Sequence, residues 1–288
     1  MSALFLWLPA LFASLGGAPD ALSSDYARPP RRSHSITVHV ARPAKGLALP
    51  PIYGPADPAR PLVVIDAGHG GHDPGAANQV HGQREKELTL ALAIALRDRL
   101  VRGGRTRVAL TRSDDRFLLL QERYDIARRL GADLFISIHA DAADNDGAQG
   151  ATIYTLSETA SDREAARLAA RENRADIING VNVGAQDSAV SSILIDLSQR
   201  EAMAQSAEFA RLLYREAAPF VPFRSTWHRF ASLVVLKAPD IPSVLFEAGY
   251  ITSAQDAARL SSPKGRTQTA EGIARAIEIH FARAQIGR

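Results

Sequence analysis

The chain contains no cysteine, which excludes disulfide bonds, a lipid-anchored cysteine and any zinc site built from thiolates. It also has no H-E-x-x-H motif, so the usual helix-borne zinc protease site is excluded. The glycine-rich stretch of residues 63–76, VVIDAGHGGHDPGA, fits neither of the two common phosphate-binding glycine motifs and has no lysine nearby. The flexible loop in this stretch therefore requires another explanation.

The main part of the chain lacks a net charge of either sign. The formal charge of +3 comes from the first 60 residues, and 28 basic and 28 acidic residues follow position 60. This balance argues against a nucleic-acid-binding domain. With 288 residues, of which 46% are apolar, the chain can build a sizeable core in one large domain or two small ones.

The longest apolar run lies near the N-terminus, at residues 3–15. This run is too short to span a membrane but suits the core of a signal peptide, and small residues follow at positions 16–18. We expect a signal peptide over residues 1–18, a periplasmic location and no stable membrane insertion after processing. No lysine or arginine precedes the run, which a mis-assigned start codon or a buried helix would explain. The Pro- and Arg-rich residues 19–60 are interpreted as a linker with one strand at residues 35–40.

From residue 61 to the C-terminus at residue 288, strand-like apolar runs alternate with patterns of helical period. Such alternation predicts an α/β fold with a central, mostly parallel or mixed sheet and helices on both faces. The expected strands lie at residues 62–65, 107–111, 134–138, 152–156, 233–237 and 243–246. The expected helices lie at residues 85–101, 118–130, 162–178, 192–218 and 267–284.

Chemically active side chains stand at the ends of three expected strands: His69, His139 and Glu247. Ligands bind at the carboxyl ends of strands in such sheets, so these residues meet in one cleft if the strands are parallel neighbours. Glu85 begins the helix after the glycine loop and can reach the same place. Two histidines and one glutamate bind zinc and leave one position for water, and Glu247 would then act as general base.

Each of these residues also has a purely structural interpretation. His69 could be a solvated turn histidine, His139 a satisfied buried histidine, and Glu85 a residue favoured at a helix N-terminus by the helix dipole. Their positions at strand ends favour ligand roles, and an unpaired carboxylate at the end of an apolar strand is costly. The remaining histidines are expected to have no ligand role: His34, His39, His72, His81, His228 and His280.

Several stretches, in this order, resemble the zinc-dependent N-acetylmuramoyl-L-alanine amidases that separate daughter cells. They read IDAGHGGHDPGA, REKELTLALA, LTR, QERYDIAR, DLFISIHAD, ENRADIINGV, ILIDLSQ and VLKAPDIPSVLFEAGYITS. The resemblance covers residues 61–288. It implies that His69, Glu85 and His139 hold one Zn²⁺, that Glu247 is the catalytic glutamate, and that peptidoglycan is the substrate, cut between N-acetylmuramic acid and L-alanine.

The loop before Glu85 departs from the family pattern and carries an extra histidine, His81. Glu87 also lies close to Glu85 in the sequence. If neither glutamate is the third ligand, the remaining candidates are Asp66, Asp73 and His81.

The helical stretch of about residues 158–218 has two interpretations: it simply covers the sheet, or it is a helical regulatory insertion. The resemblance implies the second, because relatives that need an activator plug their cleft with such a segment. A carboxylate, Glu172 or Glu164, would occupy the open position of the zinc, and Glu172 is preferred because it lies in the family-like ENRAD. The implied partner is a periplasmic activator with a LytM-type domain. Its expected contact is an apolar stripe of Ile193, Leu194 and Leu197.

Two other functions compete with the amidase. One is a zinc peptidase that uses the same site on another peptidoglycan amide bond, and the other is a non-catalytic peptidoglycan-binding protein. A complete set of two imidazoles and two carboxylates at strand ends argues against the non-catalytic protein, which has no use for it.

Overall fold

The computed structural model describes residues 48–78, 82–143, 147–177 and 189–286, all of which belong to the compact unit Val38–Arg288. The expected signal peptide, the expected strand at residues 35–40 and most of the expected linker lie outside the described residues. Within the described end of that linker, Ile52 and Tyr53 already form a strand of the main sheet. The sheet therefore begins before Pro61.

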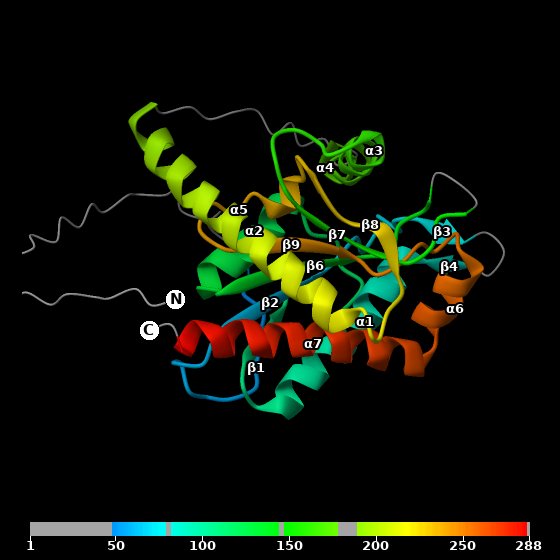
Figure 1. The fold of residues 1–288 in the computed structure, drawn as a ribbon, viewed down its shortest axis with the longest axis horizontal. Helices are drawn as coiled ribbons and strands as arrows, with labels where there is room; N and C mark the ends of the chain where they lie inside the picture. The colour runs from blue at the N-terminus through cyan, green and yellow to red at the C-terminus, as the bar shows by residue number, and fades with distance from the viewer. Residues whose placement is uncertain (1–47, 79–81, 144–146, 178–188, 287–288) are drawn as a thin grey trace, which may run out of the picture. The chain divides into compact units, whose positions relative to one another are not determined.

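One sheet of seven strands organises the chain, in the order β1-β5-β2-β6-β9-β7-β8. Its strands are β1 (Ile52–Tyr53), β2 (Leu62–Ala67), β5 (Arg107–Leu110), β6 (Leu134–His139), β7 (Ala151–Leu156), β8 (Phe223–Ala231) and β9 (Ser243–Glu247). The neighbours β5, β2, β6 and β9 run parallel, whereas β7 runs antiparallel to β9 and β1 antiparallel to β5. The predicted mixed, mostly parallel sheet is confirmed (Figure 1).

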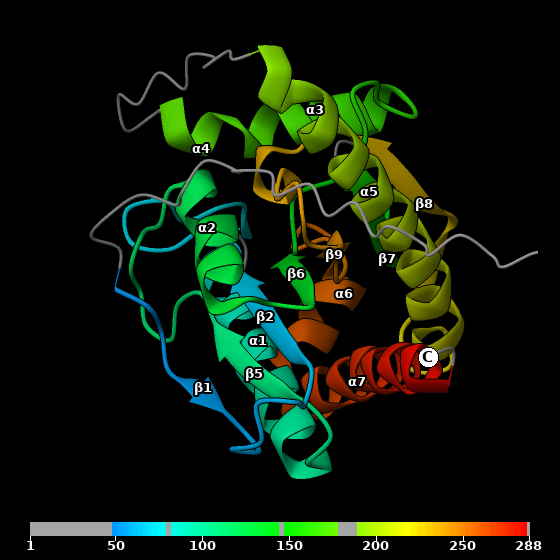
Figure 2. The same cartoon turned by 90° about the vertical axis from the view of Figure 1, so that its left-hand side faces the viewer.

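Helices cover both faces of the sheet, as predicted. The helices α1 (Glu85–Gly103), α5 (Ala189–Ala217) and α7 (Pro263–Ile286) pack on the face that presents alternate apolar residues of β2, β6 and β9. The helices α2 (Leu120–Leu130) and α3 (Arg163–Glu172) pack on the opposite face. Figures 1 and 2 show α5 and α7 side by side, in agreement with their many contacts.

The spacing of apolar residues in the sequence correctly predicted the long helix α1. Its buried leucines recur every four residues at Leu88, Leu92, Leu96 and Leu100, which places them on one stripe of the helix. Gly104 caps the C-terminus of the helix, and in its left-handed conformation (φ 64°) its amide donates to the carbonyls of Leu100 and Val101 at little steric cost to glycine.

Several local predictions were wrong or incomplete. The expected strand at residues 233–237 is a 3-10 helix, η1 (Val234–Leu236), because its apolar side chains pack against α2 and its amide groups bond within the turn. The expected helix at residues 162–178 is divided into α3 and a separate turn, α4 (Arg174–Ile177). The elements that were not predicted are β1, the hairpin β3 (Ala77–Asn78) and β4 (Gln83–Arg84), β8 and α6 (Ala254–Ser261).

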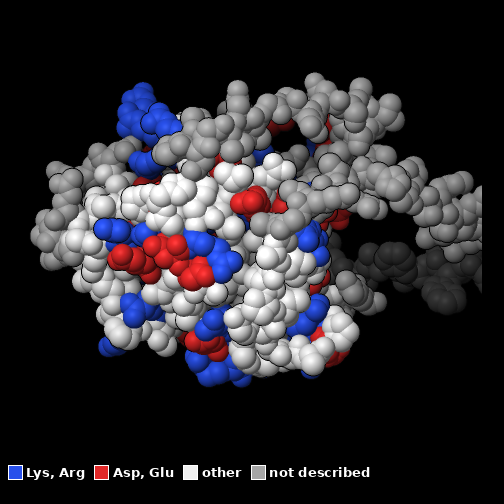
Figure 3. Space-filling model, turned by 180° about the vertical axis from the view of Figure 1, so that it is seen from behind, with Lys and Arg blue, Asp and Glu red and all other residues white. Residues whose placement is uncertain are grey.

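Acidic and basic side chains of the described residues are interleaved on the face shown in Figure 3, which agrees with the charge balance of the sequence. Among the helices of the described ranges, none is long and apolar enough to cross a membrane.

Candidate metal centre

The carboxyl ends of β2, β6 and β9 bring three predicted site residues together. His139 is paired in register with Glu247 on the neighbouring strand β9, and β2 continues past Ala67, where the amide of Gly68 donates to the carbonyl of Ile138 over 3.0 Å. His69, the next residue, therefore emerges beside His139. The condition that these strands be parallel neighbours is met.

Glu85 lies between the two histidines. Its Oε2 is 3.1 Å from Nε2 of His69, and its Oε1 is 3.2 Å from Nδ1 of His139. The backbone amides of Ala76 and Ala140 each donate to this carboxylate over 2.8 Å, which fixes both of its oxygens. Glu85 is fully buried, although it is the first residue of its helix.

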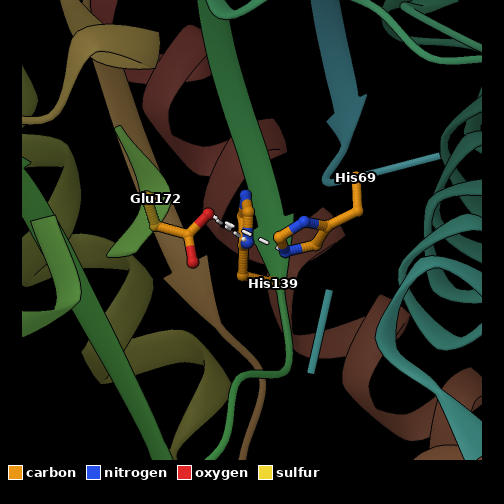
Figure 4. Close-up of side chains that lie close together, drawn as sticks. All are labelled: His69, His139 and Glu172. Atoms are coloured by element: carbon orange, nitrogen blue, oxygen red, sulfur yellow. Dashed lines mark ion pairs between the residues drawn. The ribbon is translucent and has the colours of Figure 1, made fainter. Parts of the chain in front are cut away.

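Glu172, the last residue of α3, brings a second carboxylate to the same point. Its Oε2 is 3.3 Å from Nδ1 of His139 and 3.8 Å from Nε2 of His69. Figure 4 shows its carboxylate pointing toward the two imidazoles, which meet edge to face. His69, His139 and Glu172 form a buried group that could hold a metal ion.

The loop after β2 holds His69 in an uncommon backbone conformation, with φ at 62°. Such a left-handed conformation is costly for a non-glycine residue and persists only where the surroundings fix it. Oδ2 of Asp73 lies 2.8 Å from Nδ1 of His69, and Arg123 donates to the His69 carbonyl over 3.0 Å. These contacts turn Nε2 of His69 toward Glu85, in the manner of the carboxylates that orient metal-binding histidines.

Close approach explains two of the glycines in the loop. A Cβ at Gly68 would lie 2.5 Å from the His139 ring, and one at Gly75 would lie 2.6 Å from both Glu85 and His69. Any larger residue would push the ligands apart. The glycines thus give the loop backbone room to run directly against the side chains of the site.

Charge in the site favours a cation. Burial lowers the pKa of His69, but the carboxylates of Glu85 and Glu172 more than offset burial, so its pKa lies well above the ordinary value of 6.5. The pKa of His139 is raised by the same balance. Conversely, burial raises the pKa of Glu85, yet the neighbouring histidines bring it well below its ordinary value.

Glu247 differs from Glu85 in its surroundings. One of its oxygens accepts a hydrogen bond from the amide of Asp141 over 3.2 Å, and the other has no partner among the described residues. Burial, together with the charges of Glu85 and Glu172, raises its pKa to about 8 despite the opposing effect of His139. A carboxylate with a pKa near neutrality can both accept and release a proton.

The residues present fit a metal ion. Three buried polar atoms of this site have no hydrogen-bond partner among the described residues: Nε2 of His69, Oε1 of Glu172 and Oε1 of Glu247. Buried polar atoms are rarely left unpaired, and neutral imidazole and carboxylate are a common donor set for zinc. A cavity of about 260 Å³ lies against this group and is bounded by Arg171, Glu172 and Arg174 of the α3–α4 segment.

The other carboxylates considered from the sequence lie elsewhere. Glu164 contacts Arg224, Arg229 and Tyr250 and not the histidines. Asp66 accepts hydrogen bonds from Thr111, Ser137 and Arg123 at the side of β2. Asp73 contacts the outer nitrogen of His69, and Glu87 is exposed on α1.

Of the other histidines, His72 packs on Phe117, His228 lies 3.0 Å from the Thr155 hydroxyl, and His280 packs on Phe209. His34, His39 and His81 lie outside the described residues.

Sequence reasoning gave no role to two buried arginines that support the site. Arg112 donates to the carbonyls of Ala67, Gly68 and Lys86, and Arg123 to those of Ala67 and His69. The only signal was their presence in the stretches LTR and QERYDIAR, since periodicity does not distinguish a buried arginine from a solvated one.

Comparisons with known proteins identify the family of the chain. The family model described as N-acetylmuramoyl-L-alanine amidase (Amidase_3) matches residues 63–279. N-acetylmuramoyl-L-alanine amidase AmiA of Escherichia coli (strain K12) is 37% identical over 221 residues, which is 76% of either chain. AmiC of Escherichia coli O6:H1 is 34% identical over 81% of this chain and 56% of its own length.

Two solved structures have a similar fold. The catalytic domain of CwlV, an N-acetylmuramoyl-L-alanine amidase from Bacillus (Paenibacillus) polymyxa var. colistinus, has a TM-score of 0.57 at 28% identity, over 77% of this chain and 98% of that domain. AmiC2 of Nostoc punctiforme has a TM-score of 0.55 at 28% identity, with the same coverage.

Proposed function

Since the chain belongs to the N-acetylmuramoyl-L-alanine amidase family and acts on peptidoglycan, we propose that it does so with one Zn²⁺ held by His69, Glu85 and His139 and with Glu247 as general base. This assignment rests on the two contacts of Glu85. One of its oxygens lies 3.1 Å from Nε2 of His69, and the other lies 3.2 Å from Nδ1 of His139. Bound zinc would supply Lewis acidity that polarises the scissile carbonyl and makes water acidic near neutral pH.

The protein's own part in the reaction is to position groups and move a proton. Asp73 and Arg123 fix the orientation of His69, and the amides of Ala76 and Ala140 fix Glu85. The free oxygen of Glu247 takes a proton from the attacking water as the water oxygen bonds to the carbonyl carbon. Glu247 then gives that proton to the alanine nitrogen as the carbon–nitrogen bond breaks, which leaves a free lactyl acid and a free stem peptide.

Glu172 is proposed to keep this form of the protein inactive. It approaches both histidines from α3, in the position that substrate and water would need, and only 4% of its surface is exposed. An anionic oxygen is a good zinc ligand, so a carboxylate here competes with turnover. Unregulated cutting of the cell wall is harmful, which gives a self-maintained inactive state a physiological purpose.

Activation is then proposed to require a partner that binds the open state better than the closed one. The family resemblance implies a periplasmic protein with a LytM-type domain, and daughter-cell separation as the process. On α5, Leu197 is 62% exposed and is available for such a contact. The side chains of Ile193 and Leu194 lie outside the described residues.

The test is a digest of purified peptidoglycan analysed by mass spectrometry, with and without a chelator. Free stem peptides with an intact N-terminal L-alanine identify the amidase, whereas internally cut stems identify a peptidase. If the protein releases no product although it is folded, zinc-loaded and freed of the Glu172 carboxylate, the result would favour a non-catalytic peptidoglycan-binding protein.

The inhibitory carboxylate of Glu172 is best removed by a single substitution and not by deletion of the helical segment. Ala165 and Leu168 of α3 are buried in the core on that face of the sheet, so deletion of the whole segment would expose apolar surface. Glu172→Ala removes only the carboxylate. Glu201→Ala, which removes an exposed carboxylate from α5, is the matched control.

A further inference from the structure

Two arginines of β8 bind the N-terminal end of α3. Arg224 donates to the carboxylate of Glu164, and Nη2 of Arg229 lies 3.0 Å from the other oxygen of Glu164. Nη1 of Arg229 also lies 2.5 Å from Asp162, the N-cap of α3. The Tyr250 hydroxyl completes the group, 2.8 Å from Arg224 and 3.1 Å from Glu164.

This group lies on the same face of the sheet as the general base. Tyr154 pairs with Arg229 on one side and with Leu245 on the other, and Thr152 pairs with Glu247. Residues directly opposite each other share a face, as do alternate residues along one strand. Glu247, Tyr154 and Arg229 therefore line the face that α3 covers.

Helix α3 thus places one carboxylate at each end of the covered surface. Glu172 reaches the histidines, and Glu164, eight residues earlier, reaches the arginines. At about 1.5 Å of rise per residue the two carboxylates lie roughly 12 Å apart along the helix. If α3 moves away to free the metal centre, both carboxylates leave together.

If α3 moved away, Arg224 and Arg229 would lose the carboxylates that neutralise their charge. Every ion pair that Arg224 and Arg229 make with the described residues is with Asp162 or Glu164. Their side chains are only 17% and 7% exposed, and poorly solvated guanidinium groups without a counterion are unfavourable. An anionic group of the substrate could then replace these carboxylates as the counterion of the two arginines.

The closed state also leaves donors unused at this place. Nε of Arg229 and the hydroxyl of Tyr154 are buried and have no hydrogen-bond partner among the described residues. Glu164 and Asp162 therefore do not exhaust the hydrogen-bonding capacity of the surface. A larger polar ligand could use these donors as well.

We propose that Arg224, Arg229 and Tyr250 form a subsite for a carboxylate of the stem peptide, and that Glu164 occupies this subsite in the closed state as Glu172 occupies the metal centre. The inference rests on the proposed function, because it takes the cleft under α3 as the path of the substrate. At roughly 3.3–3.6 Å per extended residue, about 12 Å corresponds to three or four residues. The recognised carboxylate thus belongs to the stem beyond the L-alanine at the scissile bond.

Peptide binding tests the subsite without any hydrolysis. The probes are the synthetic stem tripeptide L-Ala-γ-D-Glu-L-Lys with free carboxylates and the same peptide with its carboxylates amidated. They are titrated calorimetrically into the full chain carrying Glu164→Ala and Glu172→Ala. We expect the acidic peptide to bind at least about tenfold more tightly, the scale of charge-assisted hydrogen bonds.

Variants in the same background assign the preference to the arginine. Arg224→Gln should remove the preference for the acidic peptide, and Arg224→Lys should keep part of it. Arg105→Gln is the control, since it removes an exposed positive charge (69%) just before β5, which lies near the other edge of the sheet from β8. Restoring Glu164 while keeping Glu172→Ala should weaken binding of the acidic peptide only.

Equal binding of the two peptides would overturn the subsite, as would an effect of Arg224→Gln no larger than that of Arg105→Gln. Thermal unfolding shows whether each variant is folded. If Arg224→Gln is not, the comparison of acidic and amidated peptide with and without Glu164 decides alone. A preference for the acidic peptide in a protein that releases no stem peptides would refute the proposed function and leave the subsite standing.

Discussion

Gly68 and the imidazole of His139 are so close that a Cβ on Gly68 would lie 2.5 Å from Cε1 and Nε2 of the ring. The φ of Gly68 is not positive, so its backbone would accept alanine and the conflict is purely one of space. We predict that Gly68→Ala displaces His139 and lowers zinc affinity and activity by about tenfold or more, as changes to groups that orient metal ligands do. Zinc titration and a peptidoglycan assay measure both effects.

Gly147→Ala is the control for that substitution, because a Cβ at Gly147 meets nothing within 4 Å. It should leave zinc affinity and activity unchanged. Wild-type zinc affinity in Gly68→Ala would mean that His139 is not held where the structure places it.

The buried ion pair between Arg123 and Asp66, 3.0 Å apart, should be important for stability. Arg123→Met leaves the Asp66 carboxylate buried without its counterion, and we predict a loss of about 3–5 kcal/mol in the free energy of unfolding. Arg116→Met is the control, because it breaks an exposed pair with Asp114 and should cost at most about 1 kcal/mol. Urea unfolding measures both, and equal losses would contradict the prediction.

The same pair predicts how stability depends on pH. Burial raises the pKa of Asp66, but Arg123 and the hydroxyls of Thr111 and Ser137 outweigh burial and bring it below 3.8. The stabilisation is complete above the unfolded pKa and is lost as the pH falls below it, because the unfolded chain then takes up the proton first. We expect the free energy of unfolding to fall more steeply between pH 5 and pH 3 in the parent than in Arg123→Met. If the free energy of unfolding falls equally steeply in both proteins, Asp66 is not the cause of the pH dependence.

Zinc content should separate the ligands from the base. His69→Ala and His139→Ala each remove a nitrogen from the metal centre and should abolish stoichiometric zinc binding. Glu247→Ala should retain zinc and lose turnover, because its carboxylate acts on the proton and not on the metal. Elemental analysis of the purified variants, beside the activity assay, measures the difference. Loss of zinc from Glu247→Ala would make Glu247 a ligand.

The third ligand can be tested with a pair of neighbouring glutamates. Glu85 is fully buried between His69 and His139, whereas Glu87 is exposed on the same helix. We predict that Glu85→Gln weakens zinc binding substantially and that Glu87→Gln does not. Competition with a chromophoric chelator gives both affinities, and indistinguishable values would leave the third ligand unassigned.

The site residues at the strand ends could be predicted from the sequence, because a histidine or a glutamate stands at or just after the end of each apolar run. His69, His139 and Glu247 each follow or end a fully buried strand, and parallel neighbours align such ends at one edge. Glu85 was harder to assign, since a glutamate in the first turn of a helix is ordinary. Only the fold shows that it is buried between two imidazoles.

The contacts that distinguish the two candidate carboxylates of the segment at residues 158–218 could not be predicted. Glu164 and Glu172 were equivalent candidates from their helical spacing, and the partner that separates them, Arg224, lies 60 residues beyond Glu164. The strand β8 also escaped prediction, because its burial follows no alternating pattern. Residues 233–237 look like a strand by composition, yet packing against α2 makes them a 3-10 helix.

We propose above all that Glu172 blocks a metal centre that otherwise cuts the bond between N-acetylmuramic acid and L-alanine. The most direct measurement is the release of stem peptides from purified peptidoglycan by zinc-loaded Glu172→Ala, parent and Glu201→Ala, without any partner and followed by mass spectrometry. We expect rapid release of stems with a free N-terminal L-alanine by Glu172→Ala, sensitive to a chelator, and little release by the other two. If Glu172→Ala is folded and zinc-loaded but as inactive as the parent, or if the parent alone is fully active, Glu172 does not block the metal centre.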